Sequence, residues 1–113
     1  MRIVVLGSGS KGNSTFIDLG DKKILIDVGF SYKQIKEKLS LINVDPHEID
    51  ALLITHDHID HTYGLKVFLN KVKPTLFITP EVENFCLGTK YENSEYLTDE
   101  MIYYGTLIKP IPL

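Results

Sequence analysis

Three of the four histidines in the chain fall within six consecutive positions, His56 to His61, together with two aspartates. Neutral imidazole nitrogens and carboxylate oxygens are the usual ligands of zinc and of other divalent first-row metals. A cluster of donors this dense indicates a metal site and not an ordinary polar surface loop. We call residues 55–61 the metal loop.

The spacing of these donors predicts two half-sites in one loop. His56 and His58 are two positions apart, so an extended or turning backbone can aim both side chains at one ion. Asp60 and His61 are adjacent and enter the next element, so we expect them to point toward a second ion nearby. We expect Asp57 to face away from the metals.

Regular elements on both sides are predicted to hold the metal loop. The apolar run at residues 51–54 predicts a buried strand in front of it. Apolar residues at helical spacing predict a helix over 65–72, which Pro74 ends. Ligands between a strand and a helix are carried by rigid structure, as a metal site requires.

The rest of the chain alternates between strand and helix patterns, which indicates an α/β fold. We expect a buried strand at 3–6 and further strands at 15–19, 23–28 and 76–79. We also expect a helix capped by Ser31, a helical turn at Asp45-Pro46 and a helix from Pro80 to about residue 87. Residues 91–100 are predicted to be polar turns, and residues 101–111 a hairpin.

Composition and charge limit the possible classes. With 113 residues and a 43% hydrophobic fraction, the chain fits one globular domain. It has no run long enough to span a membrane and no signal peptide, so we expect a cytoplasmic protein without a membrane partner. The single cysteine, Cys86, is expected to be a buried structural thiol. A net charge of −3 disfavours a strongly basic nucleic-acid surface but allows a local groove.

A glycine-rich segment at residues 7–12 matches the dinucleotide-binding pattern, and Asp27 lies twenty residues beyond Gly7. The residues that follow are β-prone, however, and Gly20-Asp21 would break the helix that this pattern requires. Asn13 also stands where a P-loop needs its lysine. We therefore expect a turn between two strands, whose N–H groups can still form an anion-binding nest.

The pattern H-x-H-x-D-H at positions 56–61 resembles the signature of the metallo-β-lactamase superfamily. Residues 25–29 resemble the strand-Asp-Gly element that precedes this signature. The opening at residues 6–14, with its S-G-S-x-G-N-S sequence, is similar to the YycJ/VicX/WalJ type of bacterial metallo-hydrolase within that superfamily. The resemblance extends to about Pro80.

This resemblance implies the N-terminal half of a longer αβ/βα sandwich, with a mixed sheet and flanking helices. Residues 1–113 would then be a single truncated domain. The implied cofactors are two divalent ions, zinc first, with manganese or iron also suited to nitrogen and oxygen ligands. The implied ligands are His56, His58, Asp60 and His61, with Asp60 also the candidate catalytic residue. Water on such ions ionises near neutral pH, and the hydroxide attacks the substrate.

The resemblance ranks nuclease-like phosphodiester hydrolysis first, with nucleic acid as substrate. A thioester or lactam-type hydrolase is the alternative, and a non-catalytic metal-binding fragment is a third hypothesis. Asp27 is expected to accept hydrogen bonds from the metal loop and fix its shape. His47 is expected to be a surface residue. The chain alone is expected to be inactive and to self-associate through an uncovered apolar sheet face.

Overall fold

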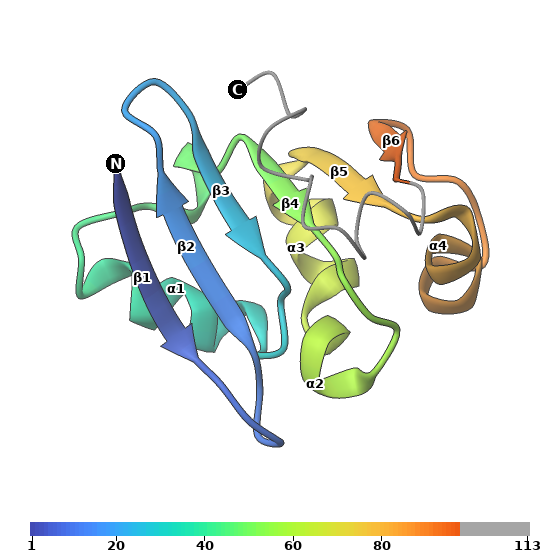
Figure 1. Cartoon of the computed structure of the whole chain (residues 1–113), viewed down its shortest axis with the longest axis horizontal. Coiled ribbons are helices and arrows are strands. Elements are labelled where there is room, and N and C mark those ends of the chain that lie inside the picture. The colour runs from blue at the N-terminus through green and yellow to red at the C-terminus, as the bar shows by residue number, and fades with distance from the viewer. Residues whose placement is uncertain (98–113) are drawn as a thin grey trace.

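A computed structural model describes residues 1–97 and contains a six-stranded mixed sheet with helices packed against it (Figure 1). The spatial order of the strands follows the sequence, from β1 to β6. The β1, β2 and β3 strands pair antiparallel, whereas β3 to β6 pair parallel. The predicted α/β class with a mixed sheet and flanking helices is confirmed. The strands are β1 (Arg2–Gly7), β2 (Ser14–Asp18), β3 (Lys23–Ile26), β4 (Ala51–Leu53), β5 (Thr75–Ile78) and β6 (Ser94–Tyr96).

The helices begin and end at the residues that local chemistry favours. They are α1 (Tyr32–Ser40), a short 3-10 turn η1 (Pro46–Glu48), α2 (Ile59–Thr62), α3 (Leu65–Val72) and α4 (Pro80–Leu87). Ser31 caps α1 through a reciprocal pair of hydrogen bonds with Gln34. Thr79 caps α4, which then ends at Gly88, whose φ of 72° suits glycine. These boundaries confirm the predicted helices.

One face of the sheet forms the main core with the helices. Phe16, Leu25, Leu52 and Leu76 lie opposite one another across β2 to β5, and each is fully buried. The buried faces of α1 and α3 pack against this row, and the Tyr32 and Phe68 rings lie 5.8 Å apart between the two helices. This core holds β4 and α3, the two elements on either side of the metal loop.

The opposite face of the sheet carries a smaller cluster around Ile17, Ile24 and Ala51. In β1, Ile3 and Val5 point to the same face and are 56% and 62% exposed. The prediction that this strand is buried is therefore wrong. Among residues 1–97, β1 pairs with β2 alone, and an edge strand buries only its inward side chains.

Two further expectations differ from the structure, and a third is not tested. Residues 94–96 form β6 and not a polar turn, because the buried Glu83 carboxylate accepts hydrogen bonds from Tyr91 N, Ser94 Oγ and Tyr96 Oη. Cys86 is half-buried at a pocket wall, and burial raises the pKa of its thiol. The predicted hairpin at 101–111 lies outside the described residues. Within residues 1–97 no helix has the length and apolarity to cross a membrane.

Candidate metal centre

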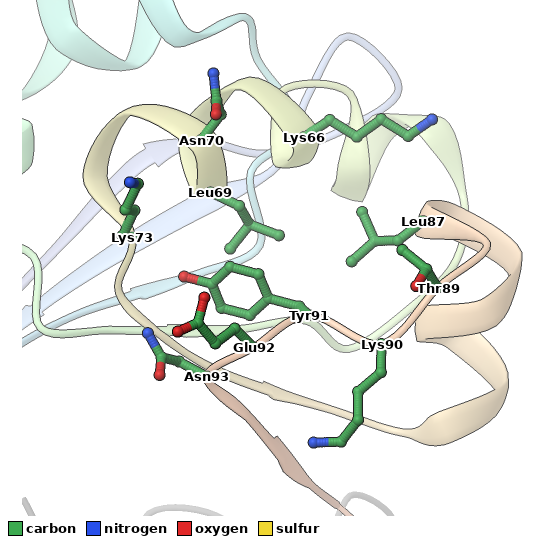
Figure 2. A pocket seen from close by; sticks show the side chains of 10 residues that line it. All are labelled: Lys66, Leu69, Asn70, Lys73, Leu87, Thr89, Lys90, Tyr91, Glu92 and Asn93. Atoms are coloured by element: carbon green, nitrogen blue, oxygen red, sulfur yellow. The ribbon is translucent and has the colours of Figure 1, made fainter.

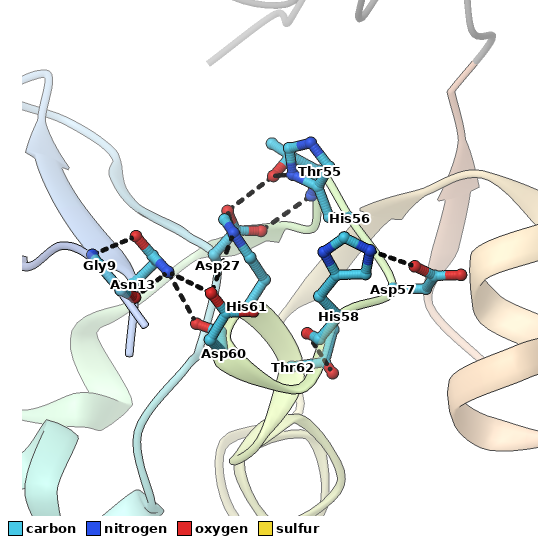
Figure 3. Close-up of polar contacts among 10 residues, drawn as sticks. All are labelled: Gly9, Asn13, Asp27, Thr55, His56, Asp57, His58, Asp60, His61 and Thr62. Atoms are coloured by element: carbon cyan, nitrogen blue, oxygen red, sulfur yellow. Dashed lines mark hydrogen bonds and ion pairs between the residues drawn. The ribbon is translucent and has the colours of Figure 1, made fainter. Parts of the chain in front are cut away.

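The metal loop begins at the carboxyl end of β4, in the middle of the sheet (Figure 1), and Figure 3 shows its side chains. Beyond β4, the N–H of the fully buried Ile54 donates to the Phe77 carbonyl, which continues the sheet for one more residue. The chain then leaves the sheet, and the short helix α2 carries Asp60 and His61. The transition from strand to helix explains why neighbouring donors point in different directions.

Three possible metal ligands lie close together where the metal loop meets the end of β3. Asp27, His56 and His61 each offer a ligand atom, and these atoms all lie within 4.8 Å of one another. The imidazole rings of His56 and His61 have centroids 4.7 Å apart. Two imidazoles and a carboxylate at this separation suit a divalent zinc-like ion, so the residues present fit the implied metal.

A chain of hydrogen bonds fixes the tautomer of both imidazoles. His61 Nδ1 lies 2.7 Å from Asp27 Oδ2, and because the carboxylate only accepts, Nδ1 carries the proton. The Thr55 hydroxyl donates to Asp27 Oδ2 over 2.7 Å, so Thr55 Oγ1 accepts from His56 Nδ1 at 2.8 Å. Both rings therefore present an unprotonated Nε2 to an ion.

Asp27 is 5% exposed and lies just beyond the end of β3. Its Oδ1 accepts the Thr55 backbone N–H at 2.8 Å, while Oδ2 accepts from Thr55 and His61. The expected hydrogen bond from the metal loop to Asp27 is thus present. Asp27 already accepts three hydrogen bonds, so we interpret it as the residue that orients His61 directly and His56 through Thr55. Its carboxylate is also close enough to both imidazoles to bind the same ion.

The remaining predicted ligands lie around this group. Asp60 Oδ2 is 3.9 Å from His61 Nε2, so Asp60 is adjacent to the cluster. His58 lies farther out: its Nε2 is 3.8 Å from Asp57 Oδ1, and its ring centroid is 6.1 Å from that of His56. Figure 3 shows Asp57 on the far side of His58 from Asp27, as expected for a residue outside the metal centre. The ligand roles of His58 and Asp60 stay predictions.

Asn13 was not predicted as a site residue, yet it connects the glycine-rich turn to Asp60. Its Nδ2 donates to the Asp60 carbonyl at 3.1 Å and to Asp60 Oδ2 at 3.2 Å. Its Oδ1 accepts the Gly9 N–H at 3.0 Å, and its backbone N–H donates to the Asp60 carbonyl at 2.8 Å. The sequence did offer one signal for Asn13: its side-chain amide closes a glycine-rich turn directly before a strand.

Two glycines, Gly29 and Gly64, allow the segment after β3 and the chain around α2 to approach closely enough to form hydrogen bonds. A Cβ on Gly29 would overlap the Asp60 carbonyl oxygen, and a Cβ on Gly64 would overlap the Phe30 carbonyl oxygen. Two backbone hydrogen bonds of 2.9 Å then hold Val28 against this part of the chain, one from Val28 N–H to the carbonyl of His61 in α2 and one from the N–H of Gly64, just before α3, to the Val28 carbonyl. The segment after β3 therefore holds α2 in place.

His47, the fourth histidine, lies away from this centre. It is exposed on η1, where its Nδ1 is 3.0 Å from Asp45 Oδ1. The glycine-rich segment joins the antiparallel strands β1 and β2, and no helix follows it. Both observations agree with the expectations that His47 is a surface residue and that residues 7–12 do not form a dinucleotide site.

Comparison with known sequences gives a consistent family. A profile of the metallo-beta-lactamase superfamily matches residues 7–112. The exodeoxyribonuclease WalJ of Streptococcus pneumoniae is 40% identical over 93 residues, which cover 82% of this chain and 33% of that protein. The exodeoxyribonuclease YycJ of Bacillus anthracis is 36% identical over 67 residues, which cover 59% of this chain and 25% of that protein. The chain therefore spans about a third of the length of such relatives.

Solved structures share the fold. A B3 metallo-beta-lactamase with an active-site glutamic acid aligns with a TM-score of 0.70 at 18% identity, over 86% of this chain and 43% of that chain. The chemotaxis sensor ODP, solved as a peroxy diiron species, aligns with a TM-score of 0.71 at 17% identity, over 87% of this chain and 41% of that chain. With the profile match across nearly all of its length, the chain belongs to the metallo-β-lactamase superfamily and resembles its YycJ type.

Proposed function

We propose that the protein containing this chain hydrolyses phosphodiester bonds in nucleic acid with the help of two divalent metal ions. The observation that supports this most directly is the orientation of two imidazoles, His61 by Asp27 directly and His56 by Asp27 through Thr55, which leaves the Nε2 atom of each ring available to an ion. The two nuclease relatives, at 36% and 40% identity, support the choice of nucleic acid as substrate.

In this proposal the residues of the metal loop divide between the two ions. His56 and His58 bind the first ion, and Asp60 and His61 contribute to the second. Bound ions would supply a water that ionises near neutral pH and positive charge opposite the phosphate. Asp60 is the catalytic residue of this half, and Asn13 holds its carboxylate through Nδ2. Further ligands would come from residues outside 1–97. We expect the 113-residue chain alone to be inactive.

The test is hydrolysis by the full-length protein after metal removal and reloading with zinc or manganese. Bis(p-nitrophenyl) phosphate reports on the phosphodiester chemistry, and a labelled single-stranded oligonucleotide reports on the substrate class. We expect turnover of both substrates to need metal and to disappear in His61→Ala, while His47→Ala on the surface keeps wild-type rates. Turnover that survives both chelation and His61→Ala would refute the proposal.

A thioester hydrolase is the second candidate, because one relative supports it. The hydroxyacylglutathione hydrolase of Buchnera aphidicola is 36% identical over 89 residues, which cover 79% of this chain and 34% of that protein. The same metal donors suit attack on a thioester carbonyl. Comparing kcat/KM for S-lactoylglutathione and for the oligonucleotide on one preparation decides between the two candidates.

A further inference from the structure

A groove between α3 and α4 leads away from the metal loop, and we propose that it binds a single strand of DNA. This inference rests on the proposed nuclease function, because it names where the substrate strand would lie beyond the reacting phosphate. The groove consists of two adjoining pockets of about 680 Å³ and 510 Å³. We call them the loop pocket and the lysine pocket.

The two pockets adjoin at Lys66, which lines both. Asp57 and His58 of the metal loop line the loop pocket together with Thr62, Lys66 and Phe85. Lys66 also lines the lysine pocket, which continues along α3 to its end at Lys73. A strand whose phosphate reaches the metal loop would pass over the exposed Lys66 side chain from the loop pocket into the lysine pocket.

The lysine pocket has an apolar floor and a basic rim. Figure 2 shows Leu69, Leu87 and Tyr91 toward its centre, with the side chains of Lys66, Lys73 and Lys90 directed outward around it. All three lysines are exposed, and within residues 1–97 none forms an ion pair. The carboxylates that line the groove are Glu92 in the lysine pocket and Asp57 in the loop pocket. In a chain of net charge −3, this local excess of lysine favours a polyanion.

Aromatic side chains lie along the same path. The Phe85 side chain is 72% exposed at the loop pocket, and Tyr63, also on this pocket, is 62% exposed. Tyr91 is anchored in the lysine pocket, since its hydroxyl donates to the Pro74 carbonyl at 2.7 Å. A positively charged groove with aromatic rings along it is the usual arrangement for single-stranded nucleic acid, whose bases stack on the rings while lysines contact the phosphates.

The presence of both exposed lysines and exposed aromatic rings favours a single strand over other occupants of the groove. A duplex presents mainly phosphates to a surface outside its grooves and would not use Phe85, because its bases are stacked inside. An apolar helix of another protein would use Leu69 and Leu87 but would leave the lysines without counter-charges. A strand with unstacked bases uses both the rings and the lysines.

The experiment measures binding and hydrolysis separately. A short fluorescein-labelled single-stranded oligodeoxynucleotide is titrated with full-length protein in EDTA, so that the probe is not cut, and anisotropy is followed over a series of salt concentrations. The variant removes the rim charges through Lys66→Ala, Lys73→Ala and Lys90→Ala together. The matched control removes the same charge elsewhere, at the exposed Lys22, Lys33 and Lys36.

We expect the slope of log affinity against log salt to fall by about two in the rim variant, since each phosphate contact on a single strand contributes about 0.7. The control should keep the wild-type slope. Phe85→Ala should lose about five-fold or more in affinity, the usual effect of one stacked base, with little change of slope. Equal slopes in the rim variant and the control would overturn the proposal, as would tighter binding of a duplex or a basic peptide. Hydrolysis of bis(p-nitrophenyl) phosphate by the wild type tests the metal centre alone, because this small ester does not extend along the groove.

Discussion

Replacing Asp27 with asparagine tests whether this residue acts by orienting the two imidazoles. The substitution keeps the size of the side chain but turns one acceptor oxygen into a donor. Asp27 Oδ2 accepts from both Thr55 Oγ1 and His61 Nδ1, each at 2.7 Å. An amide N–H₂ at that place faces two donors. With the amide nitrogen at this place, His61 must move the proton from Nδ1 to Nε2, which removes its lone pair from the ion. With the amide turned over, the nitrogen faces the Thr55 backbone N–H instead, so the metal loop loses the hydrogen bond that anchors it to β3.

The expected loss of zinc affinity can be taken from other residues that orient metal-binding histidines. Mutating a group that orients a metal-binding histidine costs about 10- to 100-fold in metal affinity or activity. The fold should survive, because the backbone bonds around α2, such as Val28 N–H to the His61 carbonyl at 2.9 Å, do not involve the Asp27 side chain. The assay is a competition titration with a zinc-binding dye on the full-length protein, with circular dichroism to check the fold.

The control for this experiment is Asp21→Asn, which removes the same charge from an exposed turn between β2 and β3. It should bind zinc as the wild type does. Asp27→Ala should resemble Asp27→Asn, since both lose the acceptor for His61. Wild-type zinc affinity in a folded Asp27→Asn variant would show that the imidazoles are positioned without this carboxylate, and the reasoning would fail.

Four further outcomes are expected. His58→Ala and Asp60→Ala should each lower the zinc content of the full-length protein, measured by elemental analysis, whereas His47→Ala should not; equal loss in all three would mean that the ligand assignment is wrong. Gly29→Ala should displace α2 and lower zinc affinity, because its Cβ overlaps the Asp60 carbonyl oxygen; unchanged zinc affinity would contradict this close approach. Burial raises the pKa of Glu83, but its hydrogen bonds lower this pKa by more, so the net pKa lies below the ordinary 4.5. The ionised carboxylate therefore stabilises the fold fully above pH 4.5, and this stabilisation is lost as the pH falls through the lowered pKa. Thermal unfolding of Glu83→Gln should therefore approach the wild type in acid and fall below it near neutral pH; a pH-independent difference would exclude this cause. The 113-residue chain alone should self-associate through the apolar sheet face that includes the exposed side chains of β1, so a stable monomer in light scattering would contradict that expectation.

The sequence predicted the elements of the fold well because each depends on local signals. The cap at Ser31, the proline at the start of α4 and the turn at Gly20-Asp21 lie within a few residues of the boundaries they set. The errors depend on neighbours distant in the chain. The apolar residues of β1 look like a buried strand, and only its place at the sheet edge exposes Ile3 and Val5. Likewise β6 has a polar sequence and is fixed by the buried Glu83 of α4.

The same distinction holds at the metal centre. The metal loop was predictable because its donors are consecutive, and the resemblance to a family brought in Asp27. Asn13 was missed because its position at the end of a glycine-rich turn is a local signal, which does not identify Asp60, forty-seven residues away, as its partner. The position of His58, turned toward Asp57 and apart from His56, was not predictable from spacing either, since an extended loop allows both directions.

The architecture around α2 explains how one half of a sandwich can carry a formed ligand loop. The glycine-rich turn contacts α2 through Asn13, the segment after β3 contacts it through Val28, and Gly29 lets both lie against the Asp60 carbonyl. These contacts come from two segments that the first three strands bring together, and they involve backbone groups more than side chains. These contacts fix the shape of the metal loop, and none of them uses the Nε2 atom of His56 or His61. His56 and His61 are already oriented, so these two rings need little reorganisation to bind an ion, whereas His58 would have to turn away from Asp57. Groups positioned in advance, as these two rings are, favour catalysis at a metal centre.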